Sequence, residues 1–466
     1  MRILSVGDSS LTGPESLEAL ARLLSAQPDA CLALSELDGV RRSLLAAAAQ
    51  AEAGQAGYIE ELNRVRERHV GVIQALFPAR EQSRVLTPIQ ILLADLEDIL
   101  HGVQLVRECS RRTQDLILSL GVRAACLLAV EYLRRHKVEA HLAESSGLVW
   151  ASRGPGEGRV DYQKSYAALR ALRASAGGLL VLPGGTAVDE RGVAVLLRRD
   201  GCDLTAALLA AALQAESLEL YTERGGVWSA DPVFVSDAFV VPELSYQEAM
   251  ELSYFGARMV HPQALVPAME LGIPVRVRGL ARPDDPGTLI CRSPKRQRGL
   301  IAGIASIEPV ALVNVEGGGM VGVPGIAARL FGALARAAVN IIMISQASSE
   351  HSICVVCRQE EAARALGALK AELAVELEAK QIQNLESRGE LAIVAVIGER
   401  MRGTPGISGR LFSALGAEGV NILAIAQGSS ETNISFVIEK AAEGPALRTV
   451  HRAFLGTENA REEKRG

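Results

Sequence analysis

The sequence predicts an α/β protein in which a mainly parallel sheet is followed by two copies of a smaller module. Strands alternate with helices over roughly the first 300 residues, the pattern of a parallel sheet covered by helices. Near the end, residues 319–356 align with residues 400–437 without a gap and match at about 20 of about 38 positions, which marks an internal repeat. With 466 residues the chain exceeds the roughly 250–300 at which single cores stop growing. We therefore expect two to four domains.

Composition excludes several classes of protein. Hydrophobic residues make up 48% and charged residues 22% of the chain, with no apolar run near the roughly 18 residues of a membrane span. Residues 1–7 read as a strand entering a turn and not as a signal peptide, so we expect a soluble, cytoplasmic protein. The net charge of -5 gives no basic excess for a nucleic acid.

The seven cysteines are scattered, which favours a reducing compartment over a disulfide framework. Cys354 and Cys357 invite a redox or metal interpretation, but they lie in a predicted strand, where side chains three positions apart point to opposite faces. The seven histidines show no ligand spacing either. We therefore expect no metal site.

In the front part, apolar runs separated by turn residues predict a series of strands. These strands are residues 1–6, 30–34, 138–142, 178–182, 218–222 and 273–277. The segment Gly7–Gly13 reads as a turn, and Thr12 with Glu15 has capping-box spacing for a helix from Pro14. Ligands of such a sheet lie at the carboxyl ends of its strands.

Residues 40–115 are predicted to be a helical insertion, a lid or scaffold. Within it, Thr87-Pro88 is typical of a helix start that opens an amphipathic run through Val106. A further apolar helix, residues 115–134, is expected to break at Gly121. Farther on, residues 198–203 open an alanine-rich helix, whose N-terminal N–H groups favour an anion.

Each repeat unit reads strand, Pro-Gly turn, helix, strand, strand. In the first unit these are residues 310–315, 325–337, 340–346 and 352–357. This βαββ order is half of a ferredoxin-like module. A lone module leaves a sheet edge uncovered, so the two copies should pack together and pair across a dimer.

These motifs resemble a known family. The paired Pro-Gly, Asn-Ile and Gln-x-Ser-Ser-Glu elements of the repeat are similar to the tandem ACT domains of aspartokinases, of the threonine-sensitive type that is often fused to homoserine dehydrogenase. In the front part, residues 248–262, 203–207, 231–232 and 286–289 resemble the family as well. The likeness covers almost the whole chain, and no dehydrogenase part follows, so a monofunctional chain is expected.

The resemblance implies an amino-acid-kinase-like three-layer α/β/α sandwich followed by two ferredoxin-like (βαββαβ) ACT modules. The implied divisions are a catalytic domain over 1–292, a linker over 293–303, ACT modules over 304–385 and 386–456, and a disordered tail over 457–466. It also implies phosphorylation of the β-carboxylate of aspartate by ATP with Mg²⁺, in biosynthesis of the lysine, threonine and methionine group, under feedback by an amino acid.

The implied site residues fall into four groups. The catalytic positions are Arg199, Asp203 and Arg258. The substrate positions are Ser35, Gly39, Arg41, Arg123 and Arg199. The nucleotide positions are Ser5, Gly7, Ser9, Thr222, Trp228, Asp231 and Arg258. The effector positions, for threonine or lysine, are Asn340, Gln346, Asn421 and Gln427.

Several family positions are substituted. Ser5 replaces the lysine of the first strand, and Asp8 replaces a glycine where backbone should approach phosphate. Val122 replaces the acid that holds the ammonium of the substrate, and arginine at 258 replaces a lysine. Loss of one preorganised donor typically costs about 10²–10³ in rate, so turnover should be impaired. Arg41 and Arg42 offer replacement positive charge.

Alternative interpretations stay open at this point. Arg199 and Asp203 could be an ion pair that closes a loop, and the glutamines of the repeat could be polar strand ends. The chain could be an active aspartokinase. It could instead be an impaired homologue that senses an amino acid and regulates a partner, such as an active aspartokinase or a homoserine dehydrogenase. A substrate carboxylate without an α-amino group would explain Val122 but not Ser5.

Overall fold

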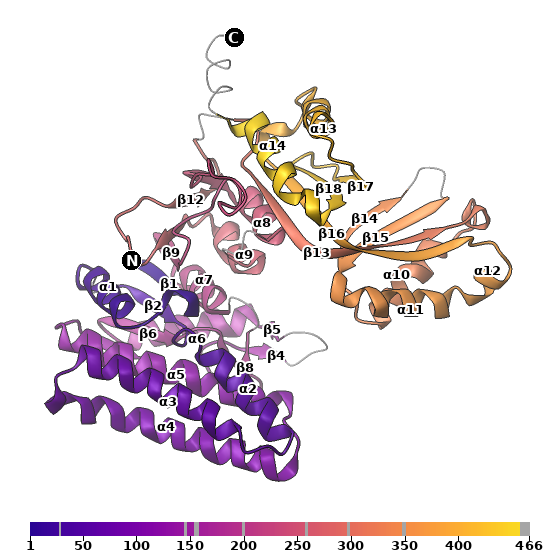
Figure 1. Ribbon diagram of the computed structural model, residues 1–466. Coiled ribbons are helices and arrows are strands. Elements are labelled where there is room, and N and C mark those ends of the chain that lie inside the picture. Colours follow the sequence, from indigo (N-terminus) through magenta and orange to yellow (C-terminus); the bar gives the residue numbers. More distant parts are fainter. Residues whose placement is uncertain are drawn as a thin grey trace. The chain divides into compact units, whose positions relative to one another are not determined.

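The computed structural model describes residues 1–27, 29–143, 147–152, 158–197, 201–256, 260–295, 299–346 and 351–456. By its internal contacts the chain forms two compact units (Figure 1). The first unit comprises Met1–Val227, Pro242–Met250 and Arg258–Lys295. The second comprises Trp228–Val241, Glu251–Ala257 and Arg296–Gly466.

The first unit is built on a mixed sheet of eight strands. In sheet order these are β10 (Glu243–Ser245), β12 (Thr288–Cys291), β11 (Val275–Gly279), β9 (Ser217–Thr222), β1 (Arg2–Val6), β2 (Cys31–Leu34), β6 (Leu179–Pro183) and β3 (Ala140–Leu142). The β11–β12 pair is antiparallel, and the other neighbouring pairs are parallel. The central strands are continuously apolar, as expected for a sheet with both faces covered. This confirms the predicted fold of the front part.

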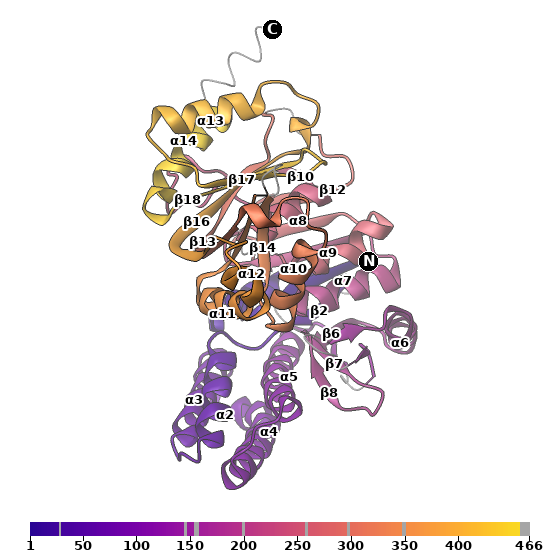
Figure 2. The same ribbon diagram turned by 90° about the vertical axis from the view of Figure 1, so that its right-hand side faces the viewer.

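Helices cover the two faces of this sheet (Figures 1 and 2). The helices of this part of the chain are α1 (Pro14–Ser25), α2 (Val40–Glu52), α3 (Tyr58–Leu76), α4 (Ala79–Val106), α5 (Arg111–Arg135), α6 (Tyr162–Ser175), α7 (Gly201–Leu213), α8 (Tyr246–Tyr254) and α9 (Pro262–Leu271). Two short ladders accompany them, β4 (Ala151–Ser152) with β5 (Arg159–Val160) and β7 (Thr186–Val188) with β8 (Ala194–Leu196). Helix α7 packs on β1 and β2, while α2 to α5 contact one another, which makes the predicted insertion a helical layer of its own.

Three local predictions were wrong. Helix α1 is capped by Ser16, whose Oγ accepts from the N–H of Gly13 and donates to its carbonyl, so the Thr12 capping box does not form. Helix α4 already begins at Ala79 and carries Pro88 inside it. Helix α5 runs unbroken through Gly121. At this position a Cβ would lie only 2.7 Å from the side chain of Leu44 on α2. The glycine permits close helix packing and does not end the helix.

Among the described residues, α5 is the one helix long and apolar enough to cross a membrane by length and composition. In the structure, 67% of its apolar 18-residue window is buried. Its side chains Ile117, Leu128 and Leu133 lie in the hydrophobic core that also contains residues of α2, α3 and α4. We therefore interpret α5 as the core helix of the first unit.

The second unit contains one antiparallel sheet of six strands. In sheet order these are β14 (Ile341–Gln346), β15 (Ser352–Arg358), β13 (Gly303–Glu316), β16 (Asn384–Ile397), β18 (Asn433–Glu439) and β17 (Ala424–Gln427). The helices are α10 (Ile326–Arg336), α11 (Ala362–Glu372), α12 (Ala374–Glu378), α13 (Ile407–Ala417) and α14 (Glu443–Leu455). Short 3-10 turns follow strands at Gly318–Met320, Gln359–Glu361, Glu399–Met401 and Lys440–Ala442, as one does at Asp8–Ser10 in the first unit.

The repeat is visible in the turns that start its helices. Gly325 and Gly406 both adopt the left-handed conformation, with φ of 95° and 86°, immediately before α10 and α13. The ferredoxin-like order of strand, helix, strand, strand that was predicted for each copy of the repeat is confirmed. The long strands β13 and β16 pair along most of their length, so that each strand serves both halves of the sheet. The domain boundaries proposed from the sequence stay predictions.

Cys354 and Cys357 lie on β15 and point to opposite faces, as expected. Cys357 is buried in the core beneath α10 and α11, whereas the thiol of Cys354 donates to Oδ1 of Asn314 on β13. Burial raises the pKa of the Cys357 thiol to about 11. Both cysteines are therefore structural.

Candidate functional site

The carboxyl ends of β1, β2, β6 and β9 form the edge of the sheet where ligands of such folds bind. Strand β1 lies between β2 and β9, and the turn after each strand rises from this edge. Helix α7 starts beside them, since a Cβ on Gly184, at the end of β6, would lie 2.4 Å from the Cys202 sulfur. The first-unit positions expected to bind substrate and nucleotide come from these turns, from the start of α7 and, for Arg123, from α5.

Ser5 and Asp203 meet at this edge. The Ser5 hydroxyl is fully buried and donates to Oδ1 of Asp203 at 2.6 Å, and its oxygen lies 3.4 Å from the Cys202 sulfur. Asp203 sits in the first turn of α7, where the helix dipole favours a negative charge. The Asp203 carboxylate thus accepts a hydrogen bond from a neutral hydroxyl, at the position where the family has the ammonium group of a lysine. The Ser5 side chain itself brings no charge to a phosphate.

Three backbone donors of the turn after β1 are used within the turn itself. The N–H of Ser9 donates to the Asp8 carboxylate at 2.9 Å, that of Ser10 to the Gly7 carbonyl, and that of Leu11 to the Asp8 carbonyl. A phosphate cradled here would need such free N–H groups. Burial, and to a smaller extent the nearby Glu36, raise the pKa of Asp8.

Glu36 is a residue that sequence reasoning missed. It is 2% exposed, accepts from the Ser35 hydroxyl at 2.7 Å and forms an ion pair with Nε of Arg41. Ser35 and Arg41 are therefore engaged with Glu36, and Arg41 supplies little net positive charge to the site. The Ser-Glu pair directly after β2 was the available signal, but its burial depends on the tertiary packing.

The remaining substrate positions, Gly39 and Arg123, lie just before α2 and on α5. Gly39 precedes α2 with φ of 83°, a left-handed conformation that favours glycine. Val122 is fully buried in the core of the first unit, so this position packs apolar neighbours and offers nothing to an ammonium group. Arg123 is half-buried and already has an interaction partner.

The end of β9 carries a buried polar cluster. The Tyr221 hydroxyl donates to Oε2 of Glu219 at 2.8 Å, and Arg278 of β11 lies 3.9 Å from the same carboxylate. Burial and the neighbouring Glu219 raise the pKa of Tyr221. Thr222 follows, and its buried Oγ1 finds no hydrogen-bond partner within the described part of the chain. That hydroxyl is a candidate donor to a ligand.

Two of the expected nucleotide positions belong to the second unit. Trp228 is half-buried, and Asp231 closes its own loop, where its Oδ1 accepts from the N–H of Val233 at 3.0 Å. Arg199 and Arg258 lie outside the described residues. The assignments of these four residues therefore stay predictions.

No group of three or more His, Cys, Asp or Glu side chains that could hold a metal ion occurs among the residues that the structure describes. Magnesium that arrives with ATP needs fewer protein ligands, since it is held by one or two carboxylates, phosphate oxygens and water. Asp203, in the first turn of α7 at this edge of the sheet, is an acidic residue that fits this requirement.

The four predicted effector residues are exposed in the second unit. Asn340 precedes β14 and Asn421 lies in the turn before β17, while Gln346 and Gln427 end these two strands. Strands β14 and β17 are the two edges of the six-stranded sheet, yet they approach each other: the Ser345 hydroxyl donates to the Ile425 carbonyl at 3.1 Å. The repeat thus brings equivalent edge strands from its two copies together.

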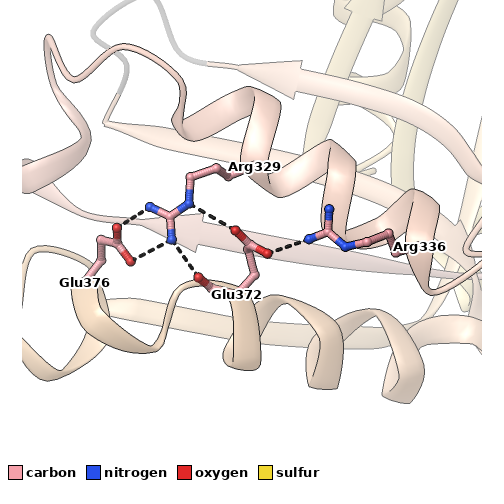
Figure 3. Close-up of polar contacts among 4 residues, drawn as sticks. All are labelled: Arg329, Arg336, Glu372 and Glu376. Carbon is pink, nitrogen blue, oxygen red and sulfur yellow. Dashed lines mark hydrogen bonds and ion pairs between the residues drawn. The ribbon is translucent and has the colours of Figure 1, made fainter.

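An ion-pair network fixes the helices of the first repeat (Figure 3). Arg329 of α10 donates from Nε to Glu372 at 3.1 Å and binds Glu376 of α12 through both terminal nitrogens. Arg336, farther along α10, donates to the other oxygen of Glu372 at 2.5 Å. The equivalent arginine of the second repeat, Arg410, instead lies over the ring of Phe454. The first helix of each repeat is therefore held differently, by ion pairs of Arg329 in the first copy and by a cation–π contact of Arg410 in the second.

Replacing Glu376 with glutamine should destabilise the second unit in a pH-dependent way. Hydrogen bonding to Arg329 lowers the pKa of Glu376, so the carboxylate stabilises the fold above the unfolded value of about 4.3 and ceases to do so as the pH falls through the lowered one. We expect Glu376→Gln to reduce the free energy of unfolding by about 0.5–1 kcal/mol at pH 7 and by almost nothing at pH 3. Urea unfolding followed by circular dichroism measures both, with the exposed Glu378→Gln as control. An equal loss at the two pH values would contradict this assignment.

The family models that match this chain fall into two groups, one in the front part of the chain and one in the repeat. Residues 1–279 match the model of the amino acid kinase family, and residues 313–373 and 394–454 each match an ACT domain model. The chain is 33% identical over 412 residues to the bifunctional aspartokinase/homoserine dehydrogenase 1, chloroplastic, of Zea mays, covering 87% of this chain and 45% of that protein. It thus spans about half the length of this relative.

Two solved structures are similar along the whole chain. Aspartokinase III of E. coli in complex with aspartate and ADP, in the R-state, superposes with a TM-score of 0.82 at 26% identity and covers 97% of this chain and 99% of that one. The same enzyme in complex with lysine and aspartate, in the T-state, gives a TM-score of 0.76 at 26% identity, with coverage of 97% and 98%.

Proposed function

The chain belongs to the amino acid kinase family, as an aspartokinase-type member with two ACT domains, and from this premise we propose that it is a slow aspartate kinase regulated by an amino acid. The observation that carries the proposal is the agreement of fold, from end to end, with an enzyme solved with aspartate and ADP. The proposed effector is threonine or lysine, and the lysine complex of that enzyme supports the second choice.

In the proposed reaction an oxygen of the aspartate β-carboxylate attacks the γ-phosphorus of ATP. The new O–P bond forms as the bond to the β,γ-bridging oxygen breaks, so aspartyl phosphate and ADP are the products. Such transfer depends on positioning and on positive charge around the phosphoryl group. Asp203, in the first turn of α7, and Thr222, at the end of β9, lie where they can orient ligands, and Mg²⁺ bound with ATP would neutralise phosphate charge.

The low rate follows from the residues at the turn after β1. Ser5 donates its only proton to Asp203, the backbone N–H groups of Ser9 and Ser10 are used within the turn, and Asp8 adds negative charge. Arg41 is paired with Glu36. Each missing donor typically costs about 10²–10³ in rate, although such losses do not add.

A regulatory subunit without turnover is the second candidate, and the burial of Val122 favours it. A fully buried valine at the place of the ammonium-binding acid leaves aspartate without one partner. The ACT half keeps its family pattern, with Asn340, Gln346, Asn421 and Gln427 exposed. In this role the chain would sense an amino acid and act on an active aspartokinase or a homoserine dehydrogenase.

We also propose that the chain forms a homodimer through its ACT domains. Exposed apolar side chains that lie together on a surface favour association with another chain. The edge residues Ile344 and Ile425 occupy equivalent positions of the repeat and are 46% and 43% exposed. Sedimentation at micromolar concentration measures the dimer, and substitution of both isoleucines by lysine should yield monomers.

Hydroxylamine trapping tests the proposed substrate, since it converts an acyl phosphate into a stable hydroxamate. With Mg-ATP, aspartate should give hydroxamate slowly, whereas succinate, which lacks the α-amino group, should give less. If succinate gave more hydroxamate than aspartate, the proposed substrate would be a carboxylate without an α-amino group and not aspartate. Calorimetric titration with threonine and lysine in the same buffer identifies the effector. Binding of an effector together with no hydroxamate at all would support the role of a regulatory subunit.

A further inference from the structure

The loop Trp228–Val241 leaves the first unit and becomes part of the second. Val227 before it and Pro242 after it belong to the first unit, and the N–H of Val227 donates to the Thr288 hydroxyl there at 2.8 Å. The loop itself packs into the core of the second unit, where Ala230 and Val235 share a buried cluster with Leu447 and Val450 of α14. Residues that the resemblance assigns to nucleotide are thus carried by the ACT half.

Ser229 makes the hydrogen bonds that hold the base of this loop. It is fully buried, its N–H donates to the Phe239 carbonyl at 2.8 Å and its Oγ accepts from the N–H of Phe239 at 3.1 Å, which closes the loop at its base. Its carbonyl accepts from the N–H of Ile304 on β13 at 2.8 Å. The same Oγ lies 3.1 Å from Nε2 of His451 on α14.

His451 completes the set of hydrogen bonds at Ser229. It is 3% exposed, and burial lowers its pKa, which favours the neutral ring. Since the Ser229 oxygen already accepts from Phe239, its one proton is available to a neutral imidazole that accepts at Nε2. The ring of Phe239 packs edge-on against the imidazole with centroids 6.1 Å apart. One side chain of α14 therefore contacts both ends of the loop.

A second contact of α14 supports the loop farther along. Arg448 lies one turn before His451 and donates to the Phe234 carbonyl at 3.3 Å. The loop is thus fastened to α14 at its base by a buried hydrogen bond and at its middle by an exposed arginine.

We propose that His451 is a positioning residue for the loop Trp228–Val241, through which the second ACT module sets the position of Trp228 and Asp231 and thereby the affinity for nucleotide. The link to affinity rests on the proposed function, whereas the link to loop position does not. Loss of the Ser229–His451 hydrogen bond leaves a buried hydroxyl without an acceptor, which favours loop conformations that reach water.

Trp228 reports the loop directly. The chain has two tryptophans, so Trp150→Phe leaves Trp228 as the single fluorophore of the full-length protein. In this background, His451→Leu should increase acrylamide quenching of Trp228 about twofold or more and raise the dissociation constant of ADP about tenfold, the effect of about 1.4 kcal/mol from one buried hydrogen bond. His451→Gln places an amide near the Nε2 position and should restore both values.

The control is His69→Leu, which makes the same substitution at a fully buried histidine of α3. It should lower stability without changing Trp228 quenching. If His451→Leu does not fold, Arg448→Ala, at an exposed side chain, should increase quenching by loosening the middle of the loop. Unchanged quenching in folded His451→Leu, or in Arg448→Ala, overturns the proposal. If the parent binds no ADP, the proposed function fails, and the quenching result still decides the role of His451.

Discussion

Substitution of Ser5 by lysine together with Asp8 by glycine is expected to raise aspartate kinase turnover by about 10²–10³-fold. A lysine at position 5 would exchange the Ser5 hydroxyl bond to Asp203 for an ion pair and bring an ammonium group to the end of β1. Glycine at position 8 removes a carboxylate and releases the N–H of Ser9, which now donates to that carboxylate. Both changes make the turn able to receive phosphate. Release of ADP with saturating aspartate and Mg-ATP measures the gain.

The matched control makes the same substitutions away from the strand ends. Ser25 ends α1, and Asp29, whose side chain is 84% exposed, precedes β2 at the amino end of the strands. Ser25→Lys with Asp29→Gly changes net charge identically and should leave turnover unchanged. A gain as large in this control, or none in the pair at positions 5 and 8, would show that the turn after β1 does not limit the reaction.

Truncation of Phe436 to alanine is expected to lower the free energy of unfolding of the second unit by about 3–5 kcal/mol. Phe436 of β18 is fully buried and packs edge-on against Phe412 of α13, with ring centroids 6.3 Å apart. Its removal leaves a cavity that strands β16 and β18 cannot close, because they are bonded in register along their length. Native-state hydrogen exchange of the second unit measures the local opening free energy.

The repeat supplies the comparison. Val355 occupies the equivalent position of the first copy and is 1% exposed, so Val355→Ala should cost only about 2 kcal/mol because fewer methyl groups are removed. Phe436→Leu, which keeps most of the volume, should cost less than Phe436→Ala. Equal costs for the two alanine variants would contradict the packing described for this core.

Much of the fold could be predicted because local signals agreed with the tertiary structure. The Pro-Gly turns of the repeat place Gly325 and Gly406 in the left-handed conformation before α10 and α13, so two helix starts and the copied module were readable from sequence. The apolar strands of the front part were readable for the same reason, since a sheet covered on both faces needs continuous apolar runs.

Other features depend on contacts that no local pattern contains. Pro88 reads as a helix start, yet it lies inside α4, whose apolar side chains, among them Ile89 and Leu93, are buried in the core. Gly121 reads as a break, yet it is the point where α5 meets Leu44. The short strands β10 and β12 at the sheet edge were missed because three or four residues carry no periodic signal.

The candidate site divides in the same way. The resemblance identifies Ser5, Asp8 and Val122 as substitutions, but it does not reveal what the new residues do. Only the structure shows that Ser5 is bonded to Asp203 and that Arg41, which offered replacement charge, is paired with Glu36. Side-chain partners across strands are set by the sheet order and not by spacing along the chain.

The turnover number of the full chain with aspartate and Mg-ATP tests the central claim most directly. We expect ADP release that depends on aspartate and is about 10²–10³-fold slower than the roughly 1–100 s⁻¹ typical of kinases. A turnover number within that ordinary range would contradict it, because a turn with Ser5 and Asp8 in these positions would then support full catalysis.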